Sequence, residues 1–161
     1  MPKARKISIK SVQVALNSNA TEDFEKVIDS LYKLIPESEE GNDVEVSHLS
    51  GGYNNPIKYI EVDYEDPEKV GEIVNVLSER LSQEDKILLY RQFYRRLTNK
   101  SVFVFRLKKY FLPLNVFKVT DASDALSIRI KFYDEITGRS KKLDSDKIRQ
   151  LLIDMGILNG I

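Results

Sequence analysis

Hydrophobic and polar positions alternate with a period of two along several stretches of the chain, which is typical of half-buried β-strands. These stretches cover residues 6–16, 44–49, 57–64, 102–108, 114–120 and 125–133. In the first stretch, Ile7 and Ile9 share one parity whereas Val12 and Val14 share the other. A β-bulge near Ser11 would bring both sets to one face of a sheet, and the pattern therefore predicts one there.

Other stretches follow the helical period, and each begins with a residue that suits a helix N-terminus. Thr21 is the predicted N-cap of the first helix, and Pro67 is placed at the first position of the second. Ser82, with Asp85 three residues later, predicts a third helix that runs through Leu97. The closing helix is predicted to begin at residue 144 or 145 and to end at residue 156.

The predicted order of elements is β-α-β-β-α-α-β-β-β-α. Half-polar strands with short connections predict an α+β fold in which a single largely antiparallel or mixed sheet has helices packed on one face. A length of 161 residues favours one domain that spans residues 1–161. The strands at 44–49 and 57–64 flank Gly, Asn and Pro residues, which predict a hairpin.

The amino-acid composition argues against several classes of function. The chain has no Cys and one His, His48, and it contains neither a Walker phosphate loop nor a GxGxxG motif. We therefore expect no cofactor, no metal site and a non-enzymatic protein, with a hydrolase that uses His48 as a minor alternative. No apolar run approaches the roughly 20 residues that span a bilayer, and no signal peptide is recognised, which predicts a cytoplasmic protein without a membrane segment.

Charge is sorted along the chain. Residues 1–85 carry 9 Lys and Arg against 18 Asp and Glu, whereas residues 86–161 carry 16 against 7, so the halves have net charges of −9 and +9. A basic half predicts contact with a polyanion, and an acidic half that neutralises it is the alternative. The cations predicted to contact phosphates are Arg91, Arg95, Arg96, Lys108, Lys109, Arg129, Lys131, Arg139, Lys141 and Lys142.

Two groups of these cations are predicted to lie on regular elements. Arg91 and Arg95 are four residues apart on a helix, where like charges repel by about 0.2–0.5 kcal/mol, so an anion is expected nearby. That anion is either RNA phosphate or the acidic side chains of the preceding helix, at positions 68, 72 and 79. Arg129 and Lys131 point away from the apolar side of the last strand. They form either a binding face or a solvated strand face.

Further residues would extend these groups. Lys118 could join the basic sheet face, and Tyr133 or Tyr110 could supply a surface on which bases stack. Arg139, Lys141 and Lys142 crowd a loop next to Gly138, a composition that suits phosphate capture but is also common in solvated loops without a ligand.

The turn Gly51-Gly52-Tyr53-Asn54-Asn55-Pro56-Ile57 resembles a His/Tyr-x-Asn-Pro-Ile turn in a small archaeal family of predicted RNA-binding exosome subunits. Segments Ala20-Thr21-Glu22-Asp23 and Leu126-Ser127-Ile128-Arg129-Ile130-Lys131 resemble other recurring pieces of that family, and the likeness spans residues 7 to about 158. The resemblance implies RNA binding and a fold similar to the 5S-RNA-binding ribosomal protein of the large subunit. The chain departs from the family at residues 106–111, where Arg-Leu-Lys-Lys-Tyr-Phe replaces an Asp-Lys pair followed by small residues.

Two functions remain open from the sequence. The first is RNA binding accessory to RNA processing or decay, with subunits of an RNA-processing complex as possible partners. If four to six cations engage phosphates at once, log K against log salt should have a slope of roughly −3 to −4. The second is a protein-assembly module, such as a homodimer, in which acidic and basic faces meet.

Overall fold

A computed structural model describes residues 6–19, 21–35, 44–50 and 56–160 of the protein. Within these ranges the sheet contains seven strands. They are β1 (Ile7–Ser18), β2 (Val44–Ser50), β3 (Pro56–Tyr64), β4 (Leu97–Thr98), β5 (Val102–Leu107), β6 (Val119–Thr120) and β7 (Leu126–Asp134). The helices are α1 (Phe24–Tyr32), α2 (Pro67–Arg80), α3 (Gln83–Arg91), α4 (Phe93–Arg96) and α5 (Ser145–Asp154), with a 3-10 turn η2 at Leu112–Leu114.

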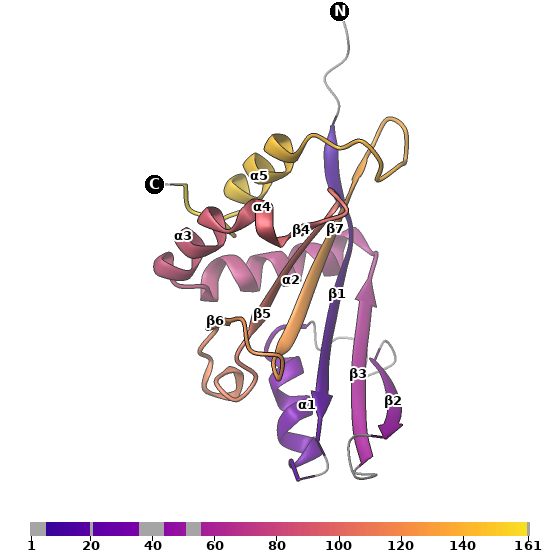
Figure 1. The fold of residues 1–161 in the computed structure, drawn as a ribbon, viewed down its shortest axis with the longest axis vertical. Coiled ribbons are helices and arrows are strands. Elements are labelled where there is room, and N and C mark those ends of the chain that lie inside the picture. The colour runs from indigo at the N-terminus through magenta and orange to yellow at the C-terminus, as the bar shows by residue number, and fades with distance from the viewer. Residues whose placement is uncertain (1–5, 20, 36–43, 51–55, 161) are drawn as a thin grey trace, which may run out of the picture.

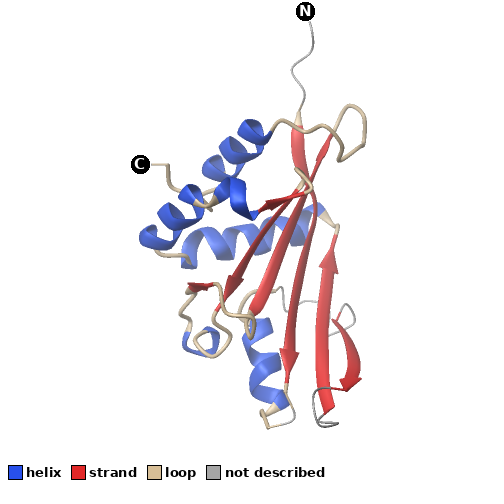
Figure 2. Cartoon of the chain, in the orientation of Figure 1, coloured by secondary structure: helices blue, strands red, loops and turns tan. Residues whose placement is uncertain are grey.

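The predicted α+β class is confirmed. Strands follow the order β2-β3-β1-β7-β5-β4, β6 pairs with β5 off this path, and every strand pair is antiparallel. Figure 1 shows the long strands side by side along the molecule, with α2 crossing behind them, α1 beside the lower end of β1, and α3–α5 at the upper left. In Figure 2 the helices lie to the left of and behind the strands.

The core lies between the sheet and the helices. Val12, Val14 and Leu16 of β1 are buried, and Ile128 and Ile130 of β7 lie in the same cluster. The pairing of β1 with β7 shifts register between Ile9 and Ser11, which confirms the predicted bulge. The extra residue lets Ile7 and Ile9 pack against the same core as the even-numbered positions that follow.

Helix starts match the sequence with one exception. Asp66 caps α2 with Pro67 at the first helical position, and the Ser82 hydroxyl oxygen accepts a hydrogen bond from Asp85 N at 3.1 Å. The prediction of Thr21 as the first N-cap is wrong, because the Asp23 carboxylate accepts from the Glu25 amide and α1 begins at Phe24. A carboxylate at this position also meets the positive end of the helix dipole.

The predicted helix through Leu97 is interrupted. Gln92 has φ −97° and ψ 9°, which ends α3 and starts the short α4. Phe93, fully buried, stacks on Phe103 with ring centroids 5.6 Å apart. Tertiary packing of this ring therefore redirects the chain, so that Leu97 starts β4 instead of ending the helix.

The predicted strand at 114–120 is wrong over most of its length. Residues 112–114 form a 3-10 turn, Asn115 is left-handed with φ 60°, and only Val119 and Thr120 pair as β6. Pro113 has no amide hydrogen to give to a ladder, which favours the turn. The hairpin of β2 and β3 is confirmed by their antiparallel pairing, and its turn at 51–55 lies outside the described residues.

Candidate nucleic-acid interface

The face of the sheet opposite the core carries the alternate residues of each strand. Gln13 of β1 lies opposite Asp63 of β3 on one side and opposite Arg129 of β7 on the other. Cross-strand partners point to the same face of an antiparallel sheet. This face, which we call the open face, therefore has a basic part on β7 and β5, an acidic part on β3, and Gln13 at the seam.

The basic part is assembled by strand register. Val104 lies opposite Arg129, Val102 lies opposite Lys131, and Arg106 lies opposite Ser127. Arg106 is thus the diagonal neighbour of Arg129, a relation that puts two side chains within reach of one extended ligand. Among the described residues, no carboxylate forms a salt bridge with Arg106, Arg129 or Lys131, and Arg106 and Arg129 are exposed.

The edge of β5 adjoins a shallow hollow of about 210 Å³ that brings three arginines together. Its lining includes Arg95 and Arg96 from α4, Arg106 from β5, and Asp121 after β6. Asp121 Oδ1 accepts from Arg96 Nη2 at 2.8 Å, and Asp121 Oδ2 lies 3.7 Å from Arg95 Nη2. A single carboxylate therefore serves two arginines and leaves the hollow with a positive excess.

Arg95 and Arg96 differ in how they are held. The Arg96 side chain is 9% exposed and its Nε donates to Gln92 Oε1 at 2.9 Å, so its guanidinium is oriented by two acceptors. The Arg95 side chain is 62% exposed and has the longer contact to Asp121. Arg96 therefore forms the floor of the hollow, and Arg95 lies at its rim.

A second hollow, of about 290 Å³, lies at the seam of the open face. Its lining is mixed in charge: Lys10, Ser11, Gln13, Asp63, Glu65, Val102, Arg129 and Lys131. Partial burial and the charge of Glu65 raise the pKa of Asp63, and Lys131 opposes this rise. Gln13 donates to Glu61, which holds the acidic part in place. The negative charge of β3 would repel a polyanion from that part of the face and leave β7 and β5 as the part open to it.

Other predicted contact residues lie elsewhere. Lys109 is 1% exposed, and its ammonium is 2.9 Å from Glu22 Oε1 and 2.6 Å from Asp124 Oδ1. A buried and neutralised ammonium does not reach RNA phosphates in this conformation. Lys108 is exposed in the β5–β6 connection, with its Nζ 5.1 Å from the Phe111 ring centroid.

The remaining predicted cations are exposed on the helical and loop regions. Arg91 ends α3, and Arg139, Lys141 and Lys142 lie in the loop after β7, where Gly138 has φ +71°. Lys118 lies apart from the open face, because its Nζ is 3.4 Å from the buried Asp85 carboxylate.

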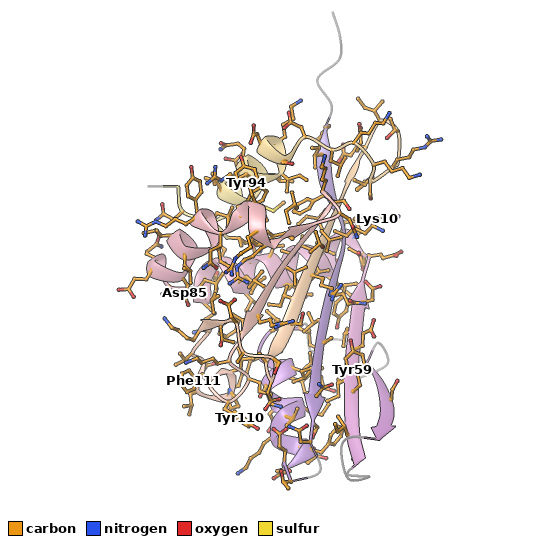
Figure 3. The ribbon with its side chains drawn as sticks, in the orientation of Figure 1. Lys10, Tyr59, Asp85, Tyr94, Tyr110 and Phe111 are labelled. Atoms are coloured by element: carbon orange, nitrogen blue, oxygen red, sulfur yellow. The ribbon has the colours of Figure 1, made fainter. Side chains whose placement is uncertain are left out.

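The proposed stacking residues are also separated. Tyr133 lies on β7 opposite Ser8, and Tyr110 donates its hydroxyl hydrogen to Glu22 beside α1 (Figure 3). Only Tyr133 is thus on the strand that carries Arg129 and Lys131. Tyr59, on the acidic strand, has its pKa raised by partial burial and by the charge of Glu61.

The sequence left open that acidic side chains of α2 neutralise Arg95 and Arg96, and the described residues show no such ion pairs. In the described part of the chain, the ion pairs of Arg95 and Arg96 are with Asp121 and not with Glu68, Glu72 or Glu79. Sequence reasoning missed Arg106 and Asp121 as parts of the site. Arg106 was detectable as a polar position in an otherwise apolar strand, whereas Asp121 depends on how the chain returns after β6.

Neither a metal centre nor a membrane helix is found within the described residues. No group of three or more His, Asp or Glu residues there is arranged to hold a metal ion. No helix in those ranges is long and apolar enough to cross a membrane. His48 is in β2 opposite Lys58, and its side chain lies outside what the structure describes.

Comparison with known proteins identifies relatives of this chain and its family. RNA-binding protein PAB1135 of Pyrococcus abyssi is 28% identical over 130 residues, which cover 80% of this chain and 84% of that protein. The solved structures of AF2318 from Archaeoglobus fulgidus and Mth689 from Methanothermobacter thermautotrophicus share the fold, with TM-scores of 0.75 and 0.71 at 21% and 20% identity. They cover 92% and 91% of this chain, and the match takes in 99% and 97% of those chains. Residues 11–132 match a family model described as RNA binding, and the chain therefore belongs to this RNA-binding family.

Proposed function

We propose that the protein binds single-stranded RNA through a cationic track that runs from the open face to the edge of β5. The track consists of Lys131, Arg129, Arg106, Arg96 and Arg95. The observation that carries this proposal is the register of β5 and β7, which sets Arg106 beside Arg129 and next to the arginine hollow. Family membership and the name of the Pyrococcus relative, an RNA-binding protein, support the same function.

Single-stranded RNA fits the track better than a duplex. The track is one strip of side chains, bounded on its far side by the acidic residues of β3. Phosphates of one strand can follow such a strip, whereas the second strand of a duplex would approach Glu61 and Asp63. The arginines offer planar forks that match phosphate oxygens in a bidentate manner.

In this proposal, Arg129 and Lys131 bind phosphates on the open face, and Arg106 lies between this face and the hollow. Arg96 presents an oriented guanidinium at the floor of the hollow, and Arg95 closes over the bound phosphate from the rim. Arg139, Lys141 and Lys142 extend the track beyond the end of β7, and Arg91 extends it along α3. The complex is purely one of binding, with no reaction step, and it suits a protein accessory to an RNA-processing assembly.

A filter-binding titration with a single-stranded oligonucleotide between about 50 and 200 mM salt tests the proposal. We expect a slope of log K against log salt near −3 to −4, and a slope shallower by roughly 0.7 for each contact removed. The double variant Arg129→Gln/Lys131→Gln should show this change. The matched control is Lys33→Gln/Lys147→Gln, which removes two exposed cations outside both hollows. No binding at low salt, or a flat salt response, removes the proposal.

A second candidate function is self-assembly, and the divided charge of the open face favours it. Two copies related by a two-fold axis could set the basic strip of one against the acidic strip of the other. Sedimentation at two salt concentrations separates the two functions. A dimer that dissociates at high salt and has no affinity for RNA supports assembly instead of RNA binding.

A further inference from the structure

The connection between β5 and β6 displays large apolar side chains to solvent. Leu114 is 71% exposed and Tyr110 is 59% exposed, and Phe111 and Val116 are exposed beside them. We call residues 110–116 the apolar platform. In Figure 3, Tyr110 and Phe111 lie at the lower left near α1, whereas Lys10 lies at the upper right. Contiguous exposed apolar side chains mark interaction sites in soluble proteins more often than single ones do.

The platform is anchored from below by a buried charge. Lys109 Nζ donates to Asn17 O at 2.8 Å, to Glu22 Oε1 at 2.9 Å and to Asp124 Oδ1 at 2.6 Å. The Ser30 hydroxyl donates to Lys109 O at 2.9 Å and ties the same residue to α1. A buried ion pair contributes little net stability compared with an apolar residue, so its advantage here is the fixed position that it imposes.

Internal hydrogen bonds make the platform rigid as well. The amides of Leu114 and Val116 donate to Phe111 O at 3.0 and 3.1 Å, and Leu112 is fully buried beneath them. The Tyr110 hydroxyl donates to Glu22, and this hydrogen bond raises the pKa of Tyr110 to about 12. Apolar side chains held in one arrangement lose little conformational entropy when a partner covers them.

A groove of about 600 Å³ lies between the platform and α1. One wall is formed by Tyr110, Pro113 and Leu114, and Val27 and Ser30 lie on the opposite wall. The other lining residues are Thr21, Glu22, Asp23, Lys26, Asp29 and Lys109. Asp23 and Asp29 are exposed, whereas the charge of Lys109 is neutralised by Glu22 and Asp124. The rim therefore carries two exposed carboxylates against one exposed cation, Lys26.

We propose that this groove and platform dock a segment of a partner protein that carries large apolar side chains flanked by Lys or Arg. The apolar wall receives the apolar anchors, and the acidic rim attracts the flanking cations and steers the encounter. RNA is a poor occupant, because the exposed carboxylates of Asp23 and Asp29 would repel its phosphates.

The docking site and the cationic track are on different parts of the fold. The groove belongs to α1 and the β5–β6 connection on the helical side of the sheet, whereas Arg129 and Lys131 are on the open face. One molecule can therefore hold RNA and a protein partner together. Such an adaptor would deliver bound RNA to the partner, and the docking does not depend on the RNA proposal being right.

Titration of ¹⁵N-labelled full-length protein with short synthetic peptides tests docking. The probe peptide carries two Leu residues flanked by Lys, one comparison peptide replaces Lys by Glu, and another replaces Leu by Ser. We expect saturable amide shifts confined to residues 21–30 and 109–116 with the probe peptide alone. Leu114→Ser should weaken its binding at least about tenfold. The control Leu88→Ser removes an exposed Leu of α3 and should leave binding unchanged.

Several outcomes would overturn the proposal. They are the absence of saturable shifts, equal binding of the Glu peptide, or equal weakening by Leu88→Ser. Shifts in the groove on addition of single-stranded RNA would assign the site to nucleic acid. A monomer–dimer equilibrium that Leu114→Ser abolishes in sedimentation would assign it to a second copy of the chain. Filter binding of RNA to Leu114→Ser is expected to match the unchanged protein, which separates this test from that of the cationic track.

Discussion

Lys109 gives the sharpest test of the structural reasoning, because sequence and structure assign it different roles. The sequence places it among the phosphate contacts, whereas the structure buries its ammonium against Glu22 and Asp124. The substitution Lys109→Ala leaves the Glu22 side chain, itself 9% exposed, without its cation. We expect the variant to lose stability and to keep its RNA affinity.

The magnitude follows from the burial of each partner. Removing one member of a buried ion pair costs about 3–5 kcal/mol. The Asp124 side chain is 46% exposed and gains solvation when its partner leaves, so we place the loss at the lower end, about 3 kcal/mol. For a chain of this size, such a loss lowers Tm by roughly 6–12 °C.

Urea denaturation followed by circular dichroism measures the free energy of unfolding, and Lys108→Ala is the matched control. Lys108 is exposed, so its substitution should change stability by no more than about 0.5 kcal/mol. At a temperature well below its Tm, Lys109→Ala should show the same slope of log K for RNA against log salt as the unchanged protein. A loss under about 1 kcal/mol together with a slope shallower by about 0.7 would refute the structural role and restore Lys109 as a phosphate contact.

Three further predictions concern other parts of the fold. Tyr110 should titrate at a pKa of about 12 by ultraviolet absorbance, and Glu22→Gln should return this pKa toward 10. Because the pKa of Tyr110 is raised in the folded state, its hydrogen bond to Glu22 stabilises the protein fully below pH 10. This stabilisation is lost as the pH rises through 12. Asp121→Asn should strengthen RNA binding by about two- to fivefold in filter assays by freeing the hollow for phosphate, and unchanged affinity would contradict this. Gly156→Ala should cost about 1–2 kcal/mol in urea denaturation, because φ is +82° and the new Cβ would lie 2.3 Å from a side-chain oxygen of α2. Gly71→Ala, which has open space around it, should be neutral or stabilising.

The sequence by itself determined the class of fold and most of its elements, because these depend on local periodicity and end signals. The parity switch around Ser11 was enough to place the bulge, and Asp66-Pro67 was enough to place the start of α2. Both depend on interactions within a few residues of one another. The separation of an acidic and a basic half is also a property of the sequence alone.

Only the tertiary structure decided which charged side chains lie close together on the surface and which are buried in ion pairs. Arg106 joins Arg129 through strand register, and Arg96 meets Asp121 across 25 positions of the chain. Lys109 has the same local signal as the exposed Lys108, but its partner Glu22 is 87 positions away, and so it is buried. The physical reason is that burial and Coulomb interaction depend on distance in space, which a local pattern of residues does not specify.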